Sequence, residues 1–396
     1  MSEAAGRGTV RSQVVSRESW WSTVGRVSGE PILPDYAGPN VRGIIPALLG
    51  PRRKGTELPN WFPEVVEHAA QVVLLVVDGL GWEQLRERAT SAPTLAALEG
   101  GPITTVAPST TSTALTSIAT GLTPGEHGIL GYRVDIGGEV LNMLRWTTAK
   151  GDARQRIVPR DLQPQRAFLG QAVPVVSKVE LQNSAFTEAH LLGGRPRGWR
   201  VPSNLAVEVS ALLAAGERFV YAYYDGIDKV AHEHGFGAHY DAELRSVDRI
   251  VGDILDSLPA EAVLCVTADH GQVHVGGNVR SPAPEVLALT RTQSGEGRFR
   301  WLHARPGAAD ELLSAAQAAH SAEAWVVSRE HVLDEGWFGP YASSVIARRL
   351  GDVALVARDP ISFDDPADSG PFALVCRHGS LTSAEMYVPF VAGSVR

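Results

Sequence analysis

An almost continuous apolar run at residues 71–77 (QVVLLVV) constrains the fold of this 396-residue chain more than any other segment. Its valines, with no polar residue after Gln71, are typical of a strand that is buried on both faces. Such strands form parallel sheets that helices cover on both sides. The run leads into Asp78-Gly79-Leu80-Gly81, which predicts a turn from strand to helix. The segment therefore predicts a buried strand of an α/β sheet.

The same alternation of helix and strand recurs along the chain. Apolar residues at helical spacing predict helices over residues 203–216 and 241–258, and the apolar runs at 219–224 and 262–266 predict the strands that follow them. A further apolar run at 372–376 predicts a last strand that returns the chain to the sheet. Because strands and helices alternate, we expect an α/β fold.

Three regions depart from this alternation. Residues 1–60 are rich in Gly, Pro and Arg and predict an irregular N-terminal tail or wrap, whereas residues 276–350 predict a small α+β insert. The predicted elements of the insert are a strand at 299–304, a helix at 308–320 and a strand at 324–328. Residues 133–200 are polar and Pro-rich, and we expect them to form pocket walls together with the insert. The α/β core is then expected over residues 61–275 and 351–396.

Charge and cysteine content exclude several classes of protein. The chain has 36 Lys and Arg against 44 Asp and Glu, a formal net charge of −8, without the clustered basic residues that bind nucleic acids. Its two cysteines, Cys265 and Cys376, lie in apolar runs and provide neither a disulfide framework nor a Cys-based zinc site. The N-terminus lacks the apolar stretch of a secretory signal, and no segment is long enough to span a bilayer. We therefore expect a cytoplasmic protein without nucleic-acid or membrane partners.

Aspartates and histidines recur at the carboxyl ends of the predicted strands, where open α/β sheets place their ligand sites. These residues are Asp78, Asp228, His232, Asp269, His270 and His378. Their carboxylate and imidazole donors suit zinc or manganese, and they are numerous enough for two adjacent ions with positions left open for a substrate. Any one of them alone could be a capping aspartate or a core histidine. Together they indicate a metal site.

A stretch rich in serine and threonine, residues 104–123, lies in a segment without any charged residue between Glu99 and Glu126. Within it, Pro108 and the hydroxyl residues that follow predict a loop that enters a helix. A hydroxyl at a helix N-terminus lies where free N–H groups and the helix dipole stabilise an anion. The alternative is an ordinary N-cap on a buried helix.

Five sequence blocks resemble the type I phosphodiesterase and nucleotide pyrophosphatase group of the alkaline phosphatase superfamily, and they occur in that family's order between Gln71 and Pro389. The blocks are VVDGLGWEQL, APSTTSTALTSIATGLTPGEHGILGY, DGIDKVAH, VTADHG and RHGSLTSAEMYVPFV. The resemblance implies an alkaline-phosphatase-like, mostly parallel central sheet flanked by helices.

The resemblance also implies a role for each site residue. Thr111 would be the nucleophile, with Thr110 as the rival because a shift of one residue cannot be settled in a Thr-Thr pair. Asp78, Asp269 and His270 would hold the metal that binds the Thr111 oxygen. Asp228, His232 and His378 would hold the second metal, and both ions would most simply be zinc. Ala114 departs from the family pattern, since many members carry there an Asn that contacts a phosphate oxygen.

The implied activity is hydrolysis of phosphodiester or pyrophosphate bonds, in nucleotide-type small molecules, through a phospho-threonine intermediate. Because no Arg or Lys lies between Glu99 and Glu126, we expect diesters and pyrophosphates to be preferred over monoester dianions, which need a further cation. A phosphomonoesterase or phosphomutase on the same scaffold is the alternative. A non-catalytic module that binds phosphorylated ligands is a third interpretation, and a sulfatase is disfavoured by the residues that follow Thr111.

Overall fold

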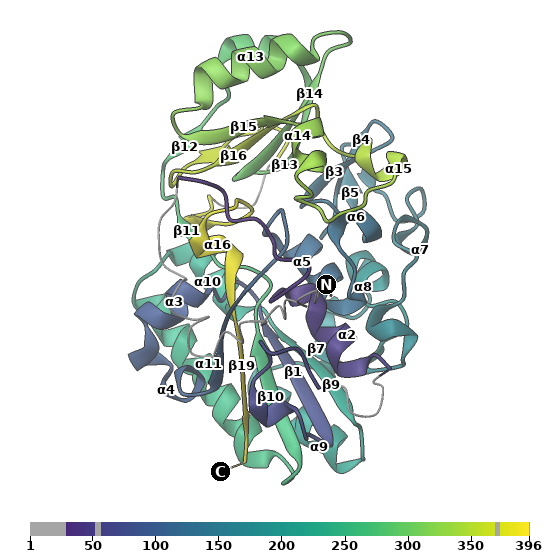
Figure 1. Cartoon of the computed structure of the whole chain (residues 1–396), viewed down its shortest axis with the longest axis vertical. Helices are drawn as coiled ribbons and strands as arrows, with labels where there is room; N and C mark the ends of the chain where they lie inside the picture. Colours follow the sequence, from purple (N-terminus) through teal and green to yellow (C-terminus); the bar gives the residue numbers. More distant parts are fainter. Residues whose placement is uncertain (1–28, 52–56, 369–372, 396) are drawn as a thin grey trace, which may run out of the picture.

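The computed structural model describes residues 29–51, 57–368 and 373–395, and its centre is a seven-stranded sheet in the order β2-β19-β10-β1-β9-β7-β8 (Figure 1). Strand β1, Gln71–Val77, pairs in parallel with β10, Ala262–Thr267, and with β9, Phe219–Tyr224. Its residues from Val72 onward are buried. A strand hydrogen-bonded on both edges and covered on both faces has no solvent-facing position, which explains its unbroken apolar run.

The outer strands make the sheet mixed but mostly parallel. On one side β7, Pro174–Lys178, and β8, Arg195–Trp199, continue the parallel pairing from β9. On the other side β19, Tyr387–Ser394, runs antiparallel to both β10 and β2, Glu99–Thr104. Strand β2 therefore points the same way as β1, and the expected α/β class with a mostly parallel sheet is confirmed.

The prediction of a last sheet strand at residues 372–376 is wrong. The chain forms only a short strand there, β18, Cys376–Arg377, which pairs with β11, Val273–His274, outside the central sheet. Phe372 itself lies outside the described residues. The strand that returns to the sheet is β19, whose Pro389 and Gly393 weaken its sequence pattern because both residues are uncommon inside strands.

Helices cover the sheet and connect its strands. Their bounds before the insert are α2 Ile44–Leu49, α3 Trp82–Glu87, α4 Pro93–Ala96, α5 Thr111–Thr120, α6 Pro124–His127, α7 Pro159–Leu162, α8 Ala185–His190, α9 Ser203–Ala214, α10 Gly226–His234 and α11 Ala238–Ser257. Helix α11 packs against α9 and β10, and α9 packs against β7 and β9. Helix α5 contacts α2, α6 and α8. The helices predicted at 203–216 and 241–258 correspond to α9 and α11.

A second sheet lies at the far end of the molecule, at the top of Figure 1. Its strands are antiparallel, in the order β13 Thr290–Glu296, β14 Phe299–Ala304, β16 Val353–Ala357 and β15 Ala324–Ser328. The helices of this part of the chain are α12 Pro284–Leu289, α13 Ala309–His320, α14 Arg329–Asp334 and α15 Ser344–Ala347. Strands β14 and β15 and helix α13 match the elements expected in the insert. Strand β16 adds to this sheet from beyond residue 350.

The remaining elements are short. Residues 133–152 form a small antiparallel sheet of β3 Arg133–Ile136, β4 Glu139–Asn142, β5 Thr147–Thr148 and β6 Gly151–Asp152. Strand β12, Val279–Arg280, pairs with β17, Ser362–Phe363, and helix α16 spans Ser383–Met386. The expected irregular tail over residues 1–60 falls largely outside the described residues, but Ile44 and Ile45 of α2 are buried in the main core. Within the described ranges, no helix has the length and apolar character needed to cross a membrane.

Candidate active site

The carboxyl ends of the parallel strands bring the predicted site residues together. Asp78 directly follows β1, Asp228 and His232 lie on α10 just after β9, and Asp269 and His270 follow β10. Thr111 is the first residue of α5, which follows β2. His378 follows β18, whose pairing with β11 holds it beside the loop that carries His270. Segments far apart in the sequence thus meet at one edge of the sheet, as expected for an α/β fold.

Asp78, Asp269 and His270 form a buried cluster whose possible ligand atoms lie within 4.8 Å of one another. Nε2 of His270 is 3.4 Å from Asp78 Oδ1 and 3.5 Å from Asp269 Oδ2. The other carboxylate oxygens are held by hydrogen bonds. The Tyr223 hydroxyl donates to Asp78 Oδ2, and the backbone N–H groups of Gly79 and His270 donate to Asp269 Oδ1, both at 3.0 Å. Asp78 Oδ1 and Asp269 Oδ2 have no hydrogen-bond partner among the described residues.

These two unpartnered oxygens indicate that the donor set fits a divalent cation. A buried carboxylate oxygen without a donor is costly, and two such oxygens facing one another repel as well. Burial raises the pKa of Asp78 well above its ordinary value, and the adjacent Asp269 raises the pKa of Asp78 further. Burial also raises the pKa of Asp269. A cation between the two carboxylates would bind both free oxygens and remove the repulsion.

A second group shares His270. Asp228, His270 and His378 also bring their possible ligand atoms within 4.8 Å of one another. Nε2 of His232, which we expect to belong with Asp228 and His378, is 3.2 Å from Asp228 Oδ1, whereas Nε2 of His378 is 3.8 Å from the same oxygen. Burial opposes ionisation of Asp228, but His232 and His378 lower its pKa below the ordinary value. His270 therefore belongs to both clusters, the one with Asp78 and Asp269 and the one with Asp228 and His378.

Backbone carbonyls set the tautomer of all three histidines. Nδ1 of His232 donates to the Cys376 carbonyl at 2.7 Å, Nδ1 of His270 donates to the Gly271 carbonyl at 3.0 Å, and Nδ1 of His378 donates to the Ser109 carbonyl at 3.0 Å. A carbonyl oxygen can only accept, so the proton of each neutral ring is on Nδ1. Each Nε2 is then left with a lone pair that faces the carboxylates. This is the arrangement that metal-binding histidines adopt.

The two candidate nucleophiles differ in their surroundings. The Thr111 hydroxyl is 3.1 Å from Nε2 of His270, and Thr111 lines a cavity together with Asp78 and Asp228. Thr110 is the N-cap residue of α5, and its side chain hydrogen-bonds to Glu296 of the insert. Burial raises the pKa of Glu296 to about 8, so this carboxyl is largely protonated at neutral pH. Thr111 thus faces the aspartates, whereas Thr110 faces the insert.

The cavity beside Thr111 has a volume of about 230 Å³ and a largely apolar wall. Leu115 of α5, Leu144, Leu181, Phe186 and Leu191 supply that wall. Most of these residues come from the stretch 133–200, as expected. Among the described residues that line the cavity, however, none comes from residues 276–350, so the expectation that the insert forms a pocket wall is wrong here. Glu296 of the insert instead contacts the Thr110 side chain and lies close to Gly379, the residue after His378.

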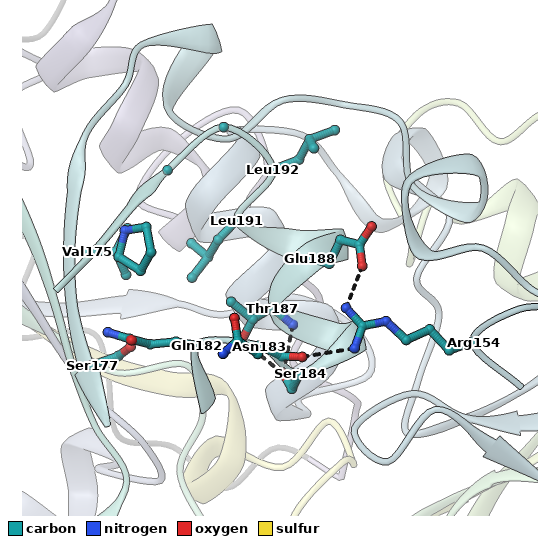
Figure 2. Close-up of a pocket in the computed structure, with 13 residues that line it drawn as sticks. Arg154, Val175, Ser177, Gln182, Asn183, Ser184, Thr187, Glu188, Leu191 and Leu192 are labelled. Atoms are coloured by element: carbon teal, nitrogen blue, oxygen red, sulfur yellow. Dashed lines mark hydrogen bonds and ion pairs between the residues drawn. The ribbon is translucent and has the colours of Figure 1, made fainter. Parts of the chain in front are cut away.

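A second cavity of about 290 Å³ adjoins the first (Figure 2). Both cavities are bordered by Ser177, Ser184 and Thr187, and the second extends to Arg154. Arg154 is held in place by Glu188 at 2.8 Å and by the Asn183 carbonyl at 3.0 Å. These two contacts hold the Arg154 guanidinium group against the protein.

A buried aspartate holds two lysines at the edge of the Thr111 cavity. Nζ of Lys178 is 2.6 Å from Asp225 Oδ1, and Lys229 donates to Asp225 Oδ2. Asp225 and Lys229 both line the cavity, and the Lys229 side chain is 60% exposed. Two ammonium groups against one carboxylate leave a net charge of +1. This edge of the cavity therefore favours an anionic ligand group.

Several residues that support the site escaped the sequence interpretation. Tyr223 contacts Asp78, and the Gln272 side chain donates to Asp228 Oδ1 at 3.0 Å. Gln272 lies two residues after His270, so its position next to the predicted ligands Asp269 and His270 could have identified it as a site residue. Tyr223 is one residue before the end of β9, and only the pairing of β9 with β1 brings it to Asp78. No sequence pattern shows that pairing.

Comparisons with known proteins identify a family model and structures of similar fold. A family model described as type I phosphodiesterase / nucleotide pyrophosphatase matches residues 72–380, most of the chain. No curated protein sequence matches the chain significantly. Among solved structures, murine ectonucleotide pyrophosphatase / phosphodiesterase 5 is similar with a TM-score of 0.61 at 16% identity, covering 82% of this chain and 88% of that one.

Two further structures carry ligands. An inactive variant of the same murine protein, in complex with AMP, is similar with a TM-score of 0.61 at 15% identity, covering 82% of this chain and 88% of that one. Phosphonoacetate hydrolase from Sinorhizobium meliloti 1021, in complex with phosphonoformate, is similar with a TM-score of 0.59 at 17% identity, covering 83% of this chain and 91% of that one. At these identities the likeness concerns the fold.

Proposed function

The chain belongs to the type I phosphodiesterase / nucleotide pyrophosphatase family, a hydrolase family on the alkaline phosphatase scaffold, and we propose that it cleaves phosphodiester or pyrophosphate bonds of nucleotide-type small molecules, with Thr111 as its nucleophile. One observation carries the proposal. The Thr111 hydroxyl lies 3.1 Å from Nε2 of His270 in a residue that lines a cavity, beside the buried oxygens of Asp78 and Asp269 that have no hydrogen-bond partner among the described residues.

The donor set supports a centre for two divalent ions, most simply zinc, because mixed carboxylate and imidazole ligands suit zinc better than magnesium or calcium. Asp78, Asp269 and His270 would hold one ion. Asp228, His232 and His378 would hold the other, with His270 close to both groups. When bound, the ions would favour the ionised Thr111 oxygen and offset negative charge on the phosphoryl oxygens.

The residues of the chain then account for two displacements at phosphorus. The ionised Thr111 oxygen attacks phosphorus in line with the leaving oxygen, which departs with the electron pair of its bond to phosphorus. A water oxygen then bonds to phosphorus opposite the Thr111 oxygen, which departs with the electron pair of its bond to phosphorus, and one proton of the water passes to the solvent, so that the protein is regenerated. Thr111 begins a helix whose first-turn N–H groups favour negative charge at this point. Ala114 of the same helix is buried and has no polar side chain that could donate to a phosphate oxygen.

The cavity supports a nucleotide-type substrate. Its apolar wall suits a flat or apolar group attached to the phosphate, and the related murine protein was solved with AMP bound. The net positive edge formed by Asp225 and its two lysines suits a second anionic group, as a pyrophosphate provides. Arg280, a possible extra cation, pairs instead with Glu323 at 3.7 Å.

The comparison that tests the substrate class uses bis(p-nitrophenyl) phosphate and p-nitrophenyl phosphate under identical zinc and pH conditions. We expect kcat/KM to be clearly higher for the diester, because no Arg or Lys lies between Glu99 and Glu126, around Thr111, to hold the extra negative charge of a monoester at the reacting phosphoryl group. A preference for the monoester would contradict the diesterase interpretation and favour the phosphatase alternative.

A substitution at Lys229 tests the pyrophosphate preference. Lys229→Met keeps a long side chain but removes the ammonium group from the cavity edge. We expect its kcat/KM for a dinucleoside diphosphate to fall about tenfold more than its kcat/KM for bis(p-nitrophenyl) phosphate, because only the former has a second charged phosphate. The matched control is Lys150→Met, which removes an exposed lysine paired with Glu139 away from the cavity. Equal losses on both substrates would show that Lys229 does not contact the second phosphate.

A further inference from the structure

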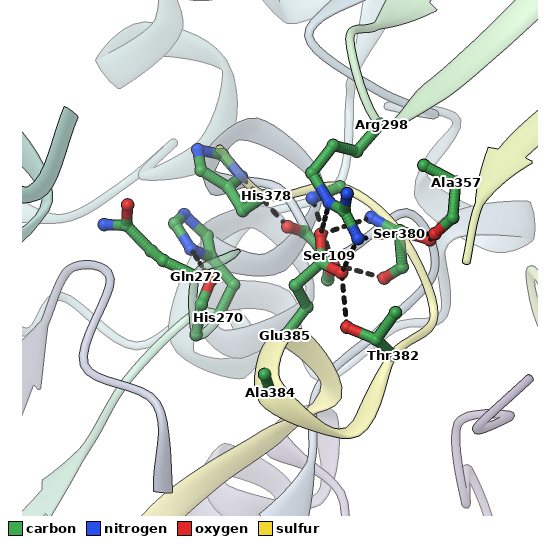
Figure 3. A network of polar contacts seen from close by, with 12 residues as sticks. Ser109, His270, Gln272, Arg298, Ala357, His378, Ser380, Thr382, Ala384 and Glu385 are labelled. Atoms are coloured by element: carbon green, nitrogen blue, oxygen red, sulfur yellow. Dashed lines mark hydrogen bonds and ion pairs between the residues drawn. The ribbon is translucent and has the colours of Figure 1, made fainter. Parts of the chain in front are cut away.

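The turn between β13 and β14 reaches from the insert to the loop that carries His378 (Figure 3). Its residues are Gly297 and Arg298, and Arg298 is completely buried. At Gly297 the backbone approaches so closely that an added Cβ would overlap the Ser362 hydroxyl and lie 2.8 Å from the Arg377 guanidinium. The turn therefore sits directly behind the residue that precedes His378.

All three guanidinium nitrogens of Arg298 donate hydrogen bonds. Two of them form a bidentate pair with Glu385, from Nε to Oε1 at 2.8 Å and from Nη2 to Oε2 at 2.9 Å. The others reach the backbone carbonyls of Asp359 at 2.9 Å, Ile361 at 2.7 Å and Ala357 at 3.3 Å. Both charged groups are fully buried. The pair therefore has one well-defined geometry.

Glu385 connects Arg298 to the loop after His378 through two further hydrogen bonds. Its Oε1 accepts the backbone N–H of Ser380 at 2.9 Å, and its Oε2 accepts the Thr382 hydroxyl at 2.5 Å. The Ser380 hydroxyl in turn donates to the Ala357 carbonyl at 2.5 Å. Ser380 is thus fixed from both sides, by α16 and by β16, which pairs with the insert strands β14 and β15.

Ser109 connects that loop to the His378 ring and to the start of α5, which carries Thr111. Its hydroxyl donates to the Ser380 carbonyl at 2.6 Å, and its backbone N–H donates to the Gly379 carbonyl at 3.3 Å. Its own carbonyl accepts Nδ1 of His378 at 3.0 Å. Ser109 is also two residues before Thr111. Ser109 therefore fixes both the orientation of the His378 imidazole and the position at which α5, the helix of Thr111, begins.

We propose that Arg298 is a positioning residue, by which the insert holds His378 and the Thr111 helix start in the geometry needed for metal binding and attack. It acts through Glu385, Ser380 and Ser109 and touches neither substrate nor metal. The inference rests on the proposed function, since it assigns a role to the His378 imidazole as a ligand. In this view the insert is a required part of the active site although it lines no wall of the Thr111 cavity.

The test uses Arg298→Lys in the full chain, which keeps a positive charge but loses the bidentate fork. Removing such a pair costs stability, so stability alone does not separate positioning from folding. The matched control is Arg300→Lys, since Arg300 is equally buried on β14 but bonds the carbonyls of Ser294 and Phe363 and pairs with Asp365 and Asp368 instead of Glu385. Zinc affinity is measured by competition with a coloured chelator, and the visible spectrum of each protein is recorded with cobalt.

Arg298→Lys should weaken binding of one zinc ion at least tenfold and change the cobalt spectrum, whereas Arg300→Lys should leave both readings as in the wild type. Wild-type zinc affinity and an unchanged cobalt spectrum in Arg298→Lys would overturn the inference, whatever its stability. If the wild type binds two ions but hydrolyses no phosphate ester, the proposed function fails while the positioning role of Arg298 can still hold. If the wild type binds no divalent ion, both fail.

Discussion

Thr111→Ala should lower kcat on bis(p-nitrophenyl) phosphate by several orders of magnitude while leaving the fold nearly intact. The substitution removes the hydroxyl that lies 3.1 Å from Nε2 of His270 and belongs to a residue lining the cavity. Among the described residues it removes only the hydrogen bond to His270, so we expect the free energy of unfolding to change by about 1 kcal/mol or less. Zinc content should stay close to that of the wild type.

Thr110→Ala is the matched control for this prediction. It deletes the same atoms from the neighbouring residue, whose side chain contacts Glu296 instead of the site. We expect a modest loss of stability and activity within about tenfold of the wild type. If Thr110→Ala were inactive and Thr111→Ala active, the nucleophile would be Thr110.

Asp269→Asn should remove zinc and activity yet stabilise the metal-free protein. An amide can keep its oxygen on the N–H groups of Gly79 and His270 and direct its NH₂ toward the unpartnered oxygen of Asp78. The substitution would remove the charge repulsion in the metal-free site and would leave neither side chain with an unpaired carboxylate oxygen. We expect at least one fewer zinc ion per chain and a loss of kcat of several orders of magnitude.

The stability change has a pH signature. Because burial raises the folded-state pKa of Asp269, the contribution of this carboxyl to the stability of the chelator-treated wild type is fully present below the ordinary pKa of an aspartate and is lost as pH rises through the raised value. Asp269→Asn should flatten that loss. Urea unfolding of both proteins with chelator and with zinc measures it, since zinc should stabilise the wild type far more than the variant. A variant that binds zinc as tightly as the wild type would contradict the assignment of Asp269 as a ligand.

The features that sequence alone predicted depend on local pattern. The buried run at 71–77 required a strand with neighbours on both edges, and it became the centre of the sheet. Residues at the ends of parallel strands were expected to converge, and Asp78, Asp228 and Asp269 do so. Here the direction of the strands follows from the helices between them, so local pattern was sufficient.

The features that sequence alone missed depend on long-range pairing. Strand β19 carries Pro and Gly and runs antiparallel, and only its hydrogen bonds to β10 and β2 make it a strand of the sheet. Arg298 and Glu385 lie 87 positions apart, and their contact arises only after the insert folds against the His378 loop. Charged residues of this kind look like surface positions in the sequence, because partners so distant leave no periodic signal.

The stereochemistry of hydrolysis at phosphorus tests most directly whether Thr111 forms a covalent intermediate. The substrate is a nucleoside phosphorothioate p-nitrophenyl ester of one configuration, hydrolysed in ¹⁸O-labelled water by the zinc-loaded protein. Attack by Thr111 and then by water each invert phosphorus, so the product should show net retention, and Thr111→Ala should form no product at a comparable rate. Net inversion would show that water attacks the substrate directly and would contradict a covalent role for Thr111.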